Sequence, residues 1–296
     1  MGSAIDIKPY EFDGSRKFVI QSAPTAVEPL YRDKPDYEAQ LAALREAIDH
    51  LQNMMYAHDR YSMLVVFQAM DAAGKDGTIR AVFSGVNPHG VVVHSFKRPT
   101  SRELDHDFLW RTTIEMPECG RIAVFNRSHY EEVLVTRVHP QIITEFQKLP
   151  GEVTRNFKAL WKDRYQAIRA FERYAADNGI VILKFFLHVS KEEQRLRFLS
   201  RIDRQEKNWK FSEQDVNERQ YWDDYQAAYE KAINESAAKH APWYVIPADD
   251  KKSMRLLVAT AVAYALKQIK MNYPQVSAAR REELQHYREQ LGNGKL

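Results

Sequence analysis

Apolar residues from position 37 onward recur at alternating spacings of four and three, which predicts one long helix with a single apolar stripe. The members of the stripe are Tyr37, Leu41, Leu44, Ile48, Leu51 and Met55. A helix packed on a sheet is the commoner explanation of such a stripe, although the spacing also suits a helix–helix seam. Residues 1–35 contain four prolines and show no sustained period, so we expect an irregular N-terminal segment there.

From residue 63 the pattern changes to short β-branched and aromatic runs separated by longer amphipathic segments. The runs predict strands at 63–67, 91–96, 122–125, 180–187 and 243–246. The segments between and after them predict helices near 77–85, 102–111, 152–178, 190–203, 215–238 and 251–270. Because the runs do not alternate with polar residues, their strands are expected to be buried on both faces, as in a parallel sheet. The pattern therefore predicts an α/β three-layer fold with a central parallel five-stranded sheet.

We place the main domain at residues 36–275 and a charged, helix-prone tail at 276–296. The tail is expected to be a surface helix or a subunit-contact helix. No internal repeat and no low-complexity tract divides the chain further. The strand–helix alternation favours one α/β domain with a small lid over two separate domains.

Composition narrows the class of protein without indicating a reaction. Of the 296 residues, 44% are hydrophobic and 28% are charged, close to the values of soluble globular proteins. The net charge of +3 excludes a histone-like protein or an acidic tail, and a single cysteine, Cys119, excludes a disulfide framework. The chain shows no secretory signal, and its longest apolar stretch is about half as long as a membrane span. We therefore expect a cytoplasmic protein without a membrane partner.

The first predicted strand leads into a loop of small residues around Gly74 and Lys75 and then into a helix. This order is typical of a Walker A loop, in which backbone N–H groups, a helix N-terminus and a lysine bind phosphate. The match is imperfect, because Ala69 replaces the first glycine and Asp76 replaces the hydroxyl residue after the lysine. Phosphate binding is the favoured interpretation, and a purely structural loop is the alternative.

Asp71 lies inside this loop, where a carboxylate repels a phosphate unless Mg²⁺ separates the two. The alternative is that Asp71 caps the helix or closes the loop. After the strand at 122–125, Asn126 stands where a magnesium-associated aspartate is usual, and Glu131 offers a replacement negative charge. Arg127 is expected at the carboxyl edge of the sheet, where ligands of open α/β folds bind. Ser128 and His129 lack the nucleophile elbow of a hydrolase.

Basic residues gather near the strand ends and in the stretch 190–210, which has seven of them against four acids. A solvated helix face is the usual explanation of such a run. Its position after a buried strand also suits a mobile arginine lid over a phosphoryl-transfer site, at about residues 195–215. A linear polyanion would need a further basic track, for which the candidates are Lys97, Arg98, Arg111, Lys207 and Lys210.

Several linked motifs between residues 35 and 270 resemble those of polyphosphate kinase family 2, a group of P-loop kinases. The motifs are FQAMDAAGKDGT (67–78), NP (87–88), SFK (95–97), FNRSHYE (125–131), VLVTRV (133–138), LHVSKEEQ (187–194), NWKF (208–211) and APWYVIPADD (241–250). The resemblance implies a P-loop kinase fold with a small helical lid. It also implies Mg²⁺-dependent transfer of a terminal phosphoryl group between inorganic polyphosphate and a nucleotide, with Mn²⁺ as a substitute ion.

Within this family, Asn126 and Glu131 resemble the class that phosphorylates nucleoside monophosphates as well as diphosphates. That implies reversible conversion of AMP to ADP and of ADP to ATP, with guanine nucleotides as alternative acceptors. Members of the family are typically homo-oligomers, which implies a dimer or a tetramer.

The resemblance also implies roles for single residues. Asp71 would coordinate Mg²⁺, with Glu131 acting through water, and Arg127 would contact the reacting phosphates. Either Arg197 or Arg201 would be the catalytic arginine of the lid, and Lys75 would hold phosphates and take part in catalysis. The phosphate- and nucleotide-binding candidates are Ala72, Ala73, Gly74, Lys75, Asp76, Gly77, Thr78, Lys97, Arg98, Arg111, Asn126, Arg137, Lys207 and Lys210.

Three functions are compatible with these residues. A polyphosphate-dependent nucleotide kinase is favoured, and an ATP-dependent nucleoside or nucleotide kinase uses the same loop chemistry. A non-catalytic polyanion or nucleic-acid binder is disfavoured by the near-neutral charge and by the absence of RNP-type, zinc or helix–turn–helix signatures. We therefore expect no nucleic-acid partner.

Overall fold

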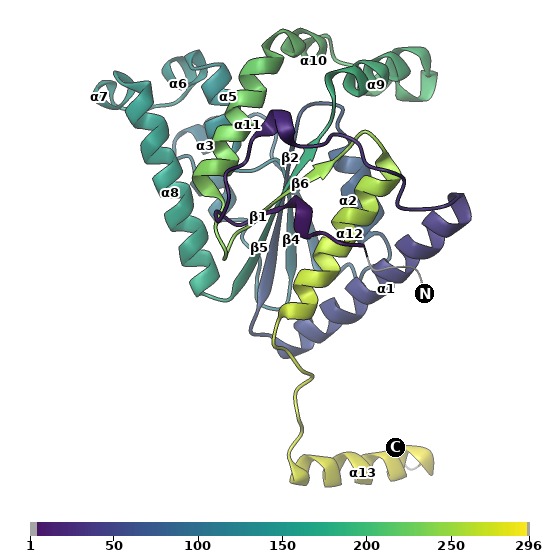
Figure 1. Ribbon diagram of the computed structural model, residues 1–296. Coiled ribbons are helices and arrows are strands. Elements are labelled where there is room, and N and C mark those ends of the chain that lie inside the picture. Colours follow the sequence, from purple (N-terminus) through teal and green to yellow (C-terminus); the bar gives the residue numbers. More distant parts are fainter. Residues whose placement is uncertain (1–4, 295–296) are drawn as a thin grey trace.

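The computed structural model of the protein describes residues 5–294 and contains a six-stranded sheet with helices on both faces (Figure 1). The first four and last two residues of the predicted terminal segments lie outside the described residues. The order across the sheet is β1-β6-β5-β2-β4-β3, and β1 alone pairs antiparallel with its neighbour. The strands are β1 (Glu11–Phe12), β2 (Ser62–Ala69), β3 (Val91–Ser95), β4 (Ile122–Asn126), β5 (Ile180–His188) and β6 (Trp243–Pro247).

The five predicted strands are confirmed as the parallel part of the sheet. Every residue of β2 and β6 is buried, as their non-alternating apolar runs require. The expectation of burial on both faces is wrong for β3, which lies at the edge of the sheet and has only half-buried or exposed residues. The prediction of a five-stranded sheet is corrected by β1, whose two residues pair with Tyr244 and Trp243 of β6. A two-residue strand is too short to produce a period in the sequence, and it forms because the edge of β6 offers backbone groups for pairing.

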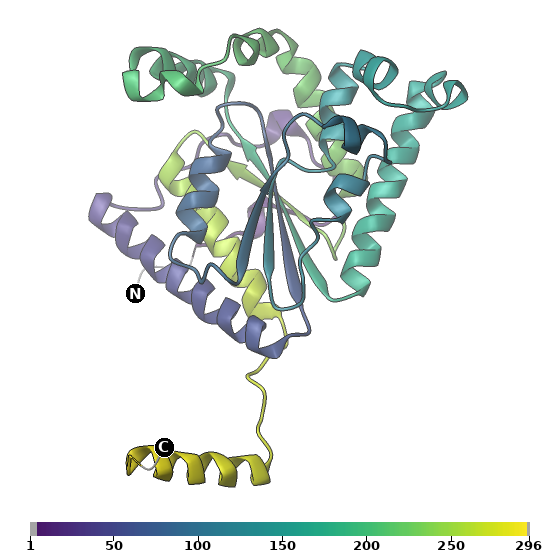
Figure 2. The same ribbon diagram turned by 180° about the vertical axis from the view of Figure 1, so that it is seen from behind.

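Helices cover the two faces of the sheet in separate groups (Figure 2). One group packs together on one face: α5 (Glu131–Val138), α8 (Phe157–Asp177) and α11 (Trp222–Ser236). The other face carries α2 (Lys75–Phe83) and α12 (Lys251–Gln268). At the top of Figure 1, α9 (Lys191–Asp203) and α10 (Glu213–Asn217) stand where a lid was predicted. The short helices are η1 (Lys8–Tyr10), η2 (Ile20–Ser22), α3 (Ser101–Leu104), α4 (Trp110–Thr113), α6 (Gln141–Phe146), α7 (Gly151–Thr154), η3 (Gln205–Lys210) and η4 (Glu218–Tyr221).

Three of the predicted helices are interrupted. The helix expected at 152–178 is α7 followed by α8, because Asn156 caps a new start by accepting the N–H of Ala159. The helix expected at 215–238 is divided into α10, η4 and α11, and the one at 102–111 into α3 and α4. The helices α5 and α6 were missed, because eight and six residues are too few for a clear helical period.

The long helix predicted from the apolar stripe is α1 (Lys34–His58). Asp33 caps its first turn by accepting the N–H of Asp36. The helix packs mainly against α12 and also against α2. The expectation that α1 packs on the sheet is therefore wrong, and the helix–helix alternative is right. An apolar stripe indicates only that one face of the helix is buried away from water, and a sheet or a second helix can bury that face equally well.

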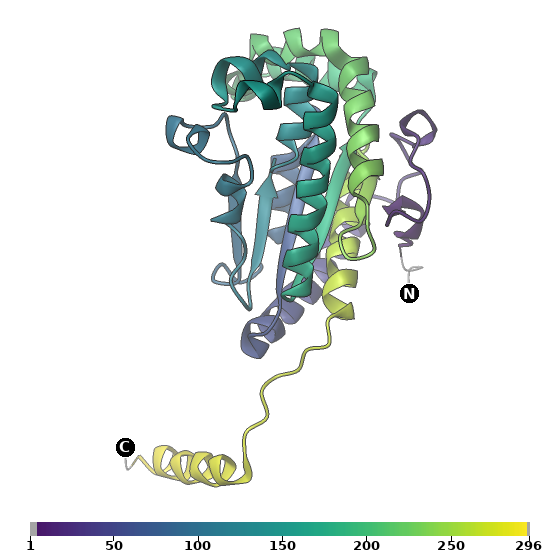
Figure 3. The ribbon, with the colours of Figure 1, turned by 90° about the vertical axis from the view of Figure 1, so that its left-hand side faces the viewer.

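The N-terminal segment runs along the outside of the domain beside α11 (Figure 3). The backbone N–H of Phe18 donates to Asn234 Oδ1, and that of Ile20 donates to Glu230 Oε2. The segment has little regular structure, as expected, yet specific hydrogen bonds to α11 hold it in place. At the other end, the predicted tail contains α13 (Ala278–Gly292), which stands apart from the body and buries none of its residues. Within the described range, no helix combines the length and the apolar composition that a membrane crossing needs.

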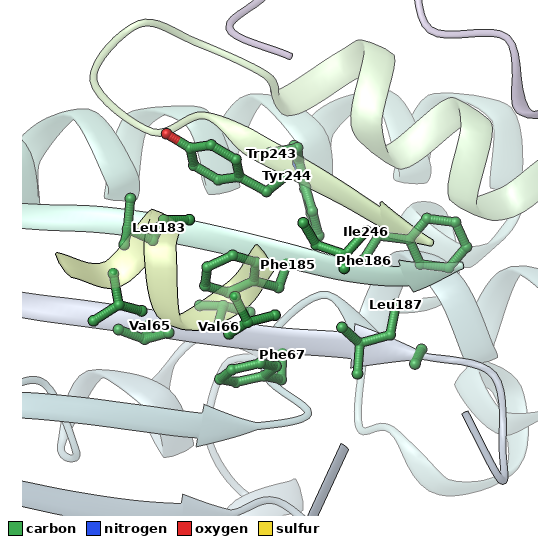
Figure 4. Packing of buried hydrophobic residues seen from close by; sticks show 14 of the residues in the cluster. Val65, Val66, Phe67, Leu183, Phe185, Phe186, Leu187, Trp243, Tyr244 and Ile246 are labelled. Atoms are coloured by element: carbon green, nitrogen blue, oxygen red, sulfur yellow. The ribbon is translucent and has the colours of Figure 1, made fainter. Parts of the chain in front are cut away.

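The core is centred on β2, β5 and β6 (Figure 4). Phe185 of β5 packs between Phe67 of β2 and Tyr244 of β6, with ring centroids 5.1 and 5.5 Å away. Because these buried rings join three parallel strands, they help to hold the carboxyl ends of the strands at one edge of the sheet.

Replacing Phe185 by Ala should lower the free energy of unfolding by about 3–5 kcal/mol, because a fully buried ring is lost and a cavity remains. Urea denaturation measures this change. The matched control is Tyr174→Ala, because Tyr174 is 68% exposed on α8, and its cost should stay within about 0.5 kcal/mol. Equal losses in the two variants would contradict the central place of Phe185 in the core.

Candidate functional site

The loop that follows β2 has the backbone geometry of an anion site. Ala72 and Gly74 have φ values of 61° and 109°. This left-handed conformation suits glycine and strains alanine, so Ala72 must be held by its surroundings. Gly74 is the N-cap of α2, and no side chain of residues 5–294 caps the first turn of that helix. The uncapped N–H groups and the positive end of the helix dipole together favour a bound anion.

A buried arginine from α9 holds this loop from behind. Arg197 is 6% exposed, and its Nε donates to Glu193 at 2.7 Å. Its two terminal nitrogens donate to the carbonyl oxygens of Ala72, Ala73, Ala248 and Asp249. All five N–H donors of Arg197 therefore have protein partners, and in this structure Arg197 belongs to the frame of the loop.

Gln194, one turn earlier on α9, donates to the carbonyl oxygen of Asp71. Three consecutive carbonyl groups of the loop are thus drawn toward α9. Because a trans peptide points its N–H opposite to its C=O, the N–H groups of Ala72 and Gly74 point away from α9. The α9 side chains therefore orient the donors that a phosphate would need.

Arg127 follows β4 and lies beside the loop. Its Nη2 is 3.3 Å from Asp71 Oδ1, and its Nη1 is 3.8 Å from Glu131 Oε2. Its φ of 63° is unusual for a residue other than glycine, and its backbone N–H donates to the carbonyl of Phe67. The side chain is 42% exposed and within reach of a ligand. The structure thus brings together Asp71, Arg127 and Glu131, which the sequence analysis had grouped.

Burial and neighbouring charges shift the protonation equilibria of this group. Burial lowers the pKa of Lys75, and the positive charge of Arg127 adds to that effect. Burial raises the pKa of Glu131, although Arg127 and Lys75 oppose the change. Attraction to Glu131, and then to Asp71, raises the pKa of Arg127. Arg127 is therefore paired with two carboxylates in a partly desolvated place, where a bound anion interacts strongly, while Lys75 Nζ donates to the carbonyl oxygen of Ala69.

Asn126 and Asp76, which both depart from the usual P-loop pattern, compensate each other. The side-chain amide of Asn126 donates to Asp76 Oδ1 at 2.6 Å. An aspartate at position 126 would instead meet a second carboxylate there and be repelled. Asp76 itself lies in the first turn of α2, where a negative charge suits the helix dipole.

The other predicted binding residues are scattered and do not gather in one place. Thr78 is buried and donates its hydroxyl to the carbonyl of Gly74, so the hydroxyl is engaged within α2. Arg111 pairs with Glu103 at 3.1 Å and donates to the carbonyl of Lys97, which braces the loop after β3. Lys97 and Arg98 are exposed on that loop.

The lid contributes an acid that the sequence analysis missed. Asp215 lies 3.3 Å from Arg201, and Arg201 also donates to the carbonyl of Lys210. Burial raises the pKa of Asp215, and the nearby charge of Asp71 adds to the rise. In the sequence Asp215 resembles an ordinary first-turn acid, and only the fold brings it close to the loop between β2 and α2 (residues 70–74), called the phosphate loop below. Lys207 makes its hydrogen bond within the lid.

Arg137 does not belong to the group at the loop. Its guanidinium packs over the ring of Trp161, 5.3 Å from the centroid. It also lines a cavity of about 1220 Å³ between the N-terminal segment and α11. None of residues 71–78 lines this cavity, so it is separate from the phosphate loop.

The acidic residues at the loop fit a magnesium ion that arrives with a phosphate ligand. In residues 5–294 no three His, Cys, Asp or Glu side chains gather closely enough to enclose a metal. Asp71 and Glu131 are partly exposed on either side of Arg127. Mg²⁺ commonly binds through one or two carboxylates, waters and substrate phosphates, which matches such an open set of donors.

The sequence model described as polyphosphate kinase 2 matches residues 31–275. The chain belongs to the polyphosphate kinase 2 family. The matched residues include the five parallel strands, the phosphate loop and the lid. They do not include β1 or α13.

Curated relatives and a solved structure of this polyphosphate kinase 2 family agree over most of the chain. The ADP-polyphosphate phosphotransferase of Rhodopseudomonas palustris is 51% identical over 288 residues, which cover 97% of this chain and 99% of the relative. The AMP/ADP-polyphosphate phosphotransferase of Meiothermus ruber is 48% identical over 239 residues, 81% and 84% of the two chains. The crystal structure of polyphosphate kinase 2 from Arthrobacter aurescens TC1 superposes with a TM-score of 0.80 at 35% identity, covering 91% and 93%.

Replacing Arg197 by Met should lower the free energy of unfolding by about 1–3 kcal/mol, because buried carbonyl groups lose their donor. Urea denaturation measures the loss. Arg195→Met is the matched control on the same helix, since Arg195 is exposed and bonds only to Glu192. If the two variants were equally stable, Arg197 would not brace the loop.

Proposed function

We propose that this member of the polyphosphate kinase 2 family transfers the terminal phosphoryl group of inorganic polyphosphate to AMP and ADP, forming ADP and ATP reversibly. The observation that carries the proposal is the position of Arg127, between Asp71 and Glu131 and beside a loop with uncapped N–H groups. The names of the two relatives support polyphosphate as the donor. They differ on the acceptor, because only the name of the Meiothermus ruber relative includes AMP.

The chemistry requires in-line positioning and stabilisation of negative charge on the transferring group. The backbone N–H groups of Ala72 and Gly74 and the ammonium of Lys75 would bind phosphate oxygens of one substrate. Arg127 would exchange part of its pairing with Asp71 for a phosphate oxygen, which charge-assisted hydrogen bonds favour. Asp71, with Glu131 through water, would hold Mg²⁺. When bound, Mg²⁺ (or Mn²⁺) neutralises charge on the phosphates.

The lid arginine in this proposal is Arg201. Its guanidinium is bound to one carboxylate and one carbonyl, whereas all five donors of Arg197 are engaged in buried or partly buried contacts. Releasing Arg201 toward a phosphate therefore breaks fewer bonds than releasing Arg197. Arg197 would act as a positioning residue for the loop.

Acceptance of AMP is the finer part of the proposal. It rests on Asn126 and Glu131. The hydrogen bond from the Asn126 amide to Asp76 gives a structural reason for an amide, instead of a carboxylate, at position 126. Adenine nucleotides are the proposed acceptors, with guanine nucleotides as alternatives. We further propose a cytoplasmic location and a homo-oligomer, either a dimer or a tetramer, for which α13 is available as a contact helix.

A donor experiment tests the reaction. The protein is incubated with AMP and Mg²⁺ and with either polyphosphate or GTP, and ADP and ATP are followed by chromatography. We expect ADP, then ATP, with polyphosphate alone as the donor. Product with GTP and none with polyphosphate would instead indicate a nucleotide kinase that uses a nucleoside triphosphate. No turnover with either donor would support a polyanion-binding protein.

Replacing Asp71 by Asn, or Arg127 by Ala, should lower kcat by about 100-fold or more, because each removes a charge that faces the reacting phosphates. Steady-state rates with polyphosphate and ADP measure the effect. The controls are Asp177→Asn and Arg280→Ala, whose exposed side chains lie on α8 and α13. Near-normal turnover of Asp71→Asn would remove the metal role, and equal losses in Arg127→Ala and Arg280→Ala would remove Arg127 from the chemistry.

A further inference from the structure

A fully buried ion pair lies behind the candidate site. Lys184 of β5 and Glu172 of α8 are 2.6 Å apart, with side-chain exposures of 0% and 1%. Lys184 Nζ also donates to the carbonyl oxygen of Ser236 at 2.9 Å. A charged residue in the middle of a strand is unexpected here, because its neighbours Leu183 and Phe185 belong to the apolar core.

This ion pair is not an efficient way to stabilise a core. Removing two charges from water is costly, and well-packed apolar residues of similar volume often replace such a pair without loss of stability. Buried polar groups can instead hold one specific arrangement of the chain, a role that must be argued for each protein. The relevant question is therefore which atoms the pair orients.

The pair holds the hydroxyl group of Tyr130. Tyr130 donates to Glu172 Oε1 at 2.7 Å and accepts from Lys184 Nζ at 3.0 Å. The Tyr130 ring is buried and lies edge-on to Trp243, with centroids 4.8 Å apart. Burial, followed by the negative charge of Glu172, raises the pKa of Tyr130 well above its usual range, so the phenol stays protonated and remains a donor. Both ends of this side chain are thus fixed.

Tyr130 belongs to the turn that carries two of the candidate site residues. The turn begins at Arg127, whose φ is 63°, and Tyr130 directly precedes Glu131, the first residue of α5. The backbone N–H groups of Tyr130 and Glu131 donate to the hydroxyl and the carbonyl of Ser128. Gln68, at the end of β2, donates to the same Ser128 hydroxyl at 3.1 Å. A strained turn of this kind persists only where its surroundings determine it.

We propose that the Lys184–Glu172 pair and the Tyr130 hydroxyl form a positioning network that fixes the 127–131 turn. The network thereby holds Arg127 and Glu131 in place around the transferring phosphate. The inference rests on the proposed function for its catalytic consequence. It goes beyond that function in assigning a task to three buried groups that touch no substrate. A displacement of about 1 Å at a catalytic group can cost about 100-fold in rate, so such a network acts on kcat.

Two variants test the network. Tyr130→Phe removes one oxygen atom and leaves the ion pair in place. Tyr130→Phe/Glu172→Leu/Lys184→Met replaces the three side chains by apolar groups and removes both members of the ion pair, while the carbonyl of Ser236 loses its donor and buried His129 loses its acidic neighbour. We expect both variants to lower kcat about tenfold or more. The KM for polyphosphate should change less than about threefold, because the substitutions do not touch the loop that follows β2. If the network only stabilised the fold, the triple variant would have the same kcat as the natural protein.

Hydrogen–deuterium exchange gives a readout that does not depend on turnover. In both variants the amides of residues 127–134 should exchange faster, while those of β2 should not change. The control is Arg169→Met/Glu235→Leu, which removes a different ion pair, one that joins α8 to α11 and does not involve Tyr130. It should leave both kcat and exchange at 127–134 unchanged.

The outcomes separate this proposal from the proposed function. Unchanged exchange at 127–134 in Tyr130→Phe would overturn the positioning role, as would unchanged kcat despite faster exchange. If the triple variant does not fold, Tyr130→Phe decides alone, through exchange and kcat together. If the natural protein shows no turnover with polyphosphate, the proposed function fails, and exchange still decides whether the network fixes the turn.

Discussion

The geometry of the phosphate loop depends on one buried guanidinium group. Arg197 joins three segments, because its donors reach the loop after β2, the connection between β6 and α12, and a residue of its own helix. The bonds to Ala73 and Ala248 are the costliest to break, since their freed carbonyl groups would remain buried without this partner. The start of α9 and the phosphate loop therefore form one rigid unit.

The same loop shows how a nearly neutral chain can accommodate a polyanion. The net charge of +3 is an average, and it hides a local balance in which Arg127 pairs with Asp71 and Glu131 while Lys75 lies alongside. Without a ligand, Arg127 is paired with two carboxylates, and Lys75 Nζ donates to the carbonyl oxygen of Ala69 at 2.9 Å. A phosphate accompanied by a divalent cation carries both signs of charge and can exchange partners with this set.

The fold was largely predictable from the sequence, and the errors of that prediction have a common cause. Apolar runs without alternation identified the five parallel strands, and in β2 and β6 the reason is that a strand covered on both faces has no polar side. The run of β3 identified a strand as well, but the expected burial is absent there because β3 lies at the sheet edge. The same criterion could not find β1, which is two residues long, and it could not tell that α1 packs on α12. In each case the missing information was the identity of the partner, which periodicity does not record.

The candidate site divides in the same way. Asp71, Lys75, Arg127 and Glu131 were identified from residue type and from their place after two adjacent parallel strands, whose carboxyl ends must meet at one edge. Arg197 was identified as a lid arginine for the same reason, but the sequence could not show that its donors are engaged. Asp215 was missed because a first-turn acid is common on any helix surface.

The sequence by itself determined the strands, the phosphate loop and the residue types that face it, because these depend on local patterns and on chain order. Only the tertiary structure decided which of them lie beside the loop, which brace it and which lie elsewhere. The physical reason is that the deciding contacts are distant in the chain. Arg197 reaches Ala72 across 125 positions, and Lys184 reaches the Tyr130 hydroxyl across 54. The partner of a buried polar group is chosen by packing, and packing is a property of the whole fold.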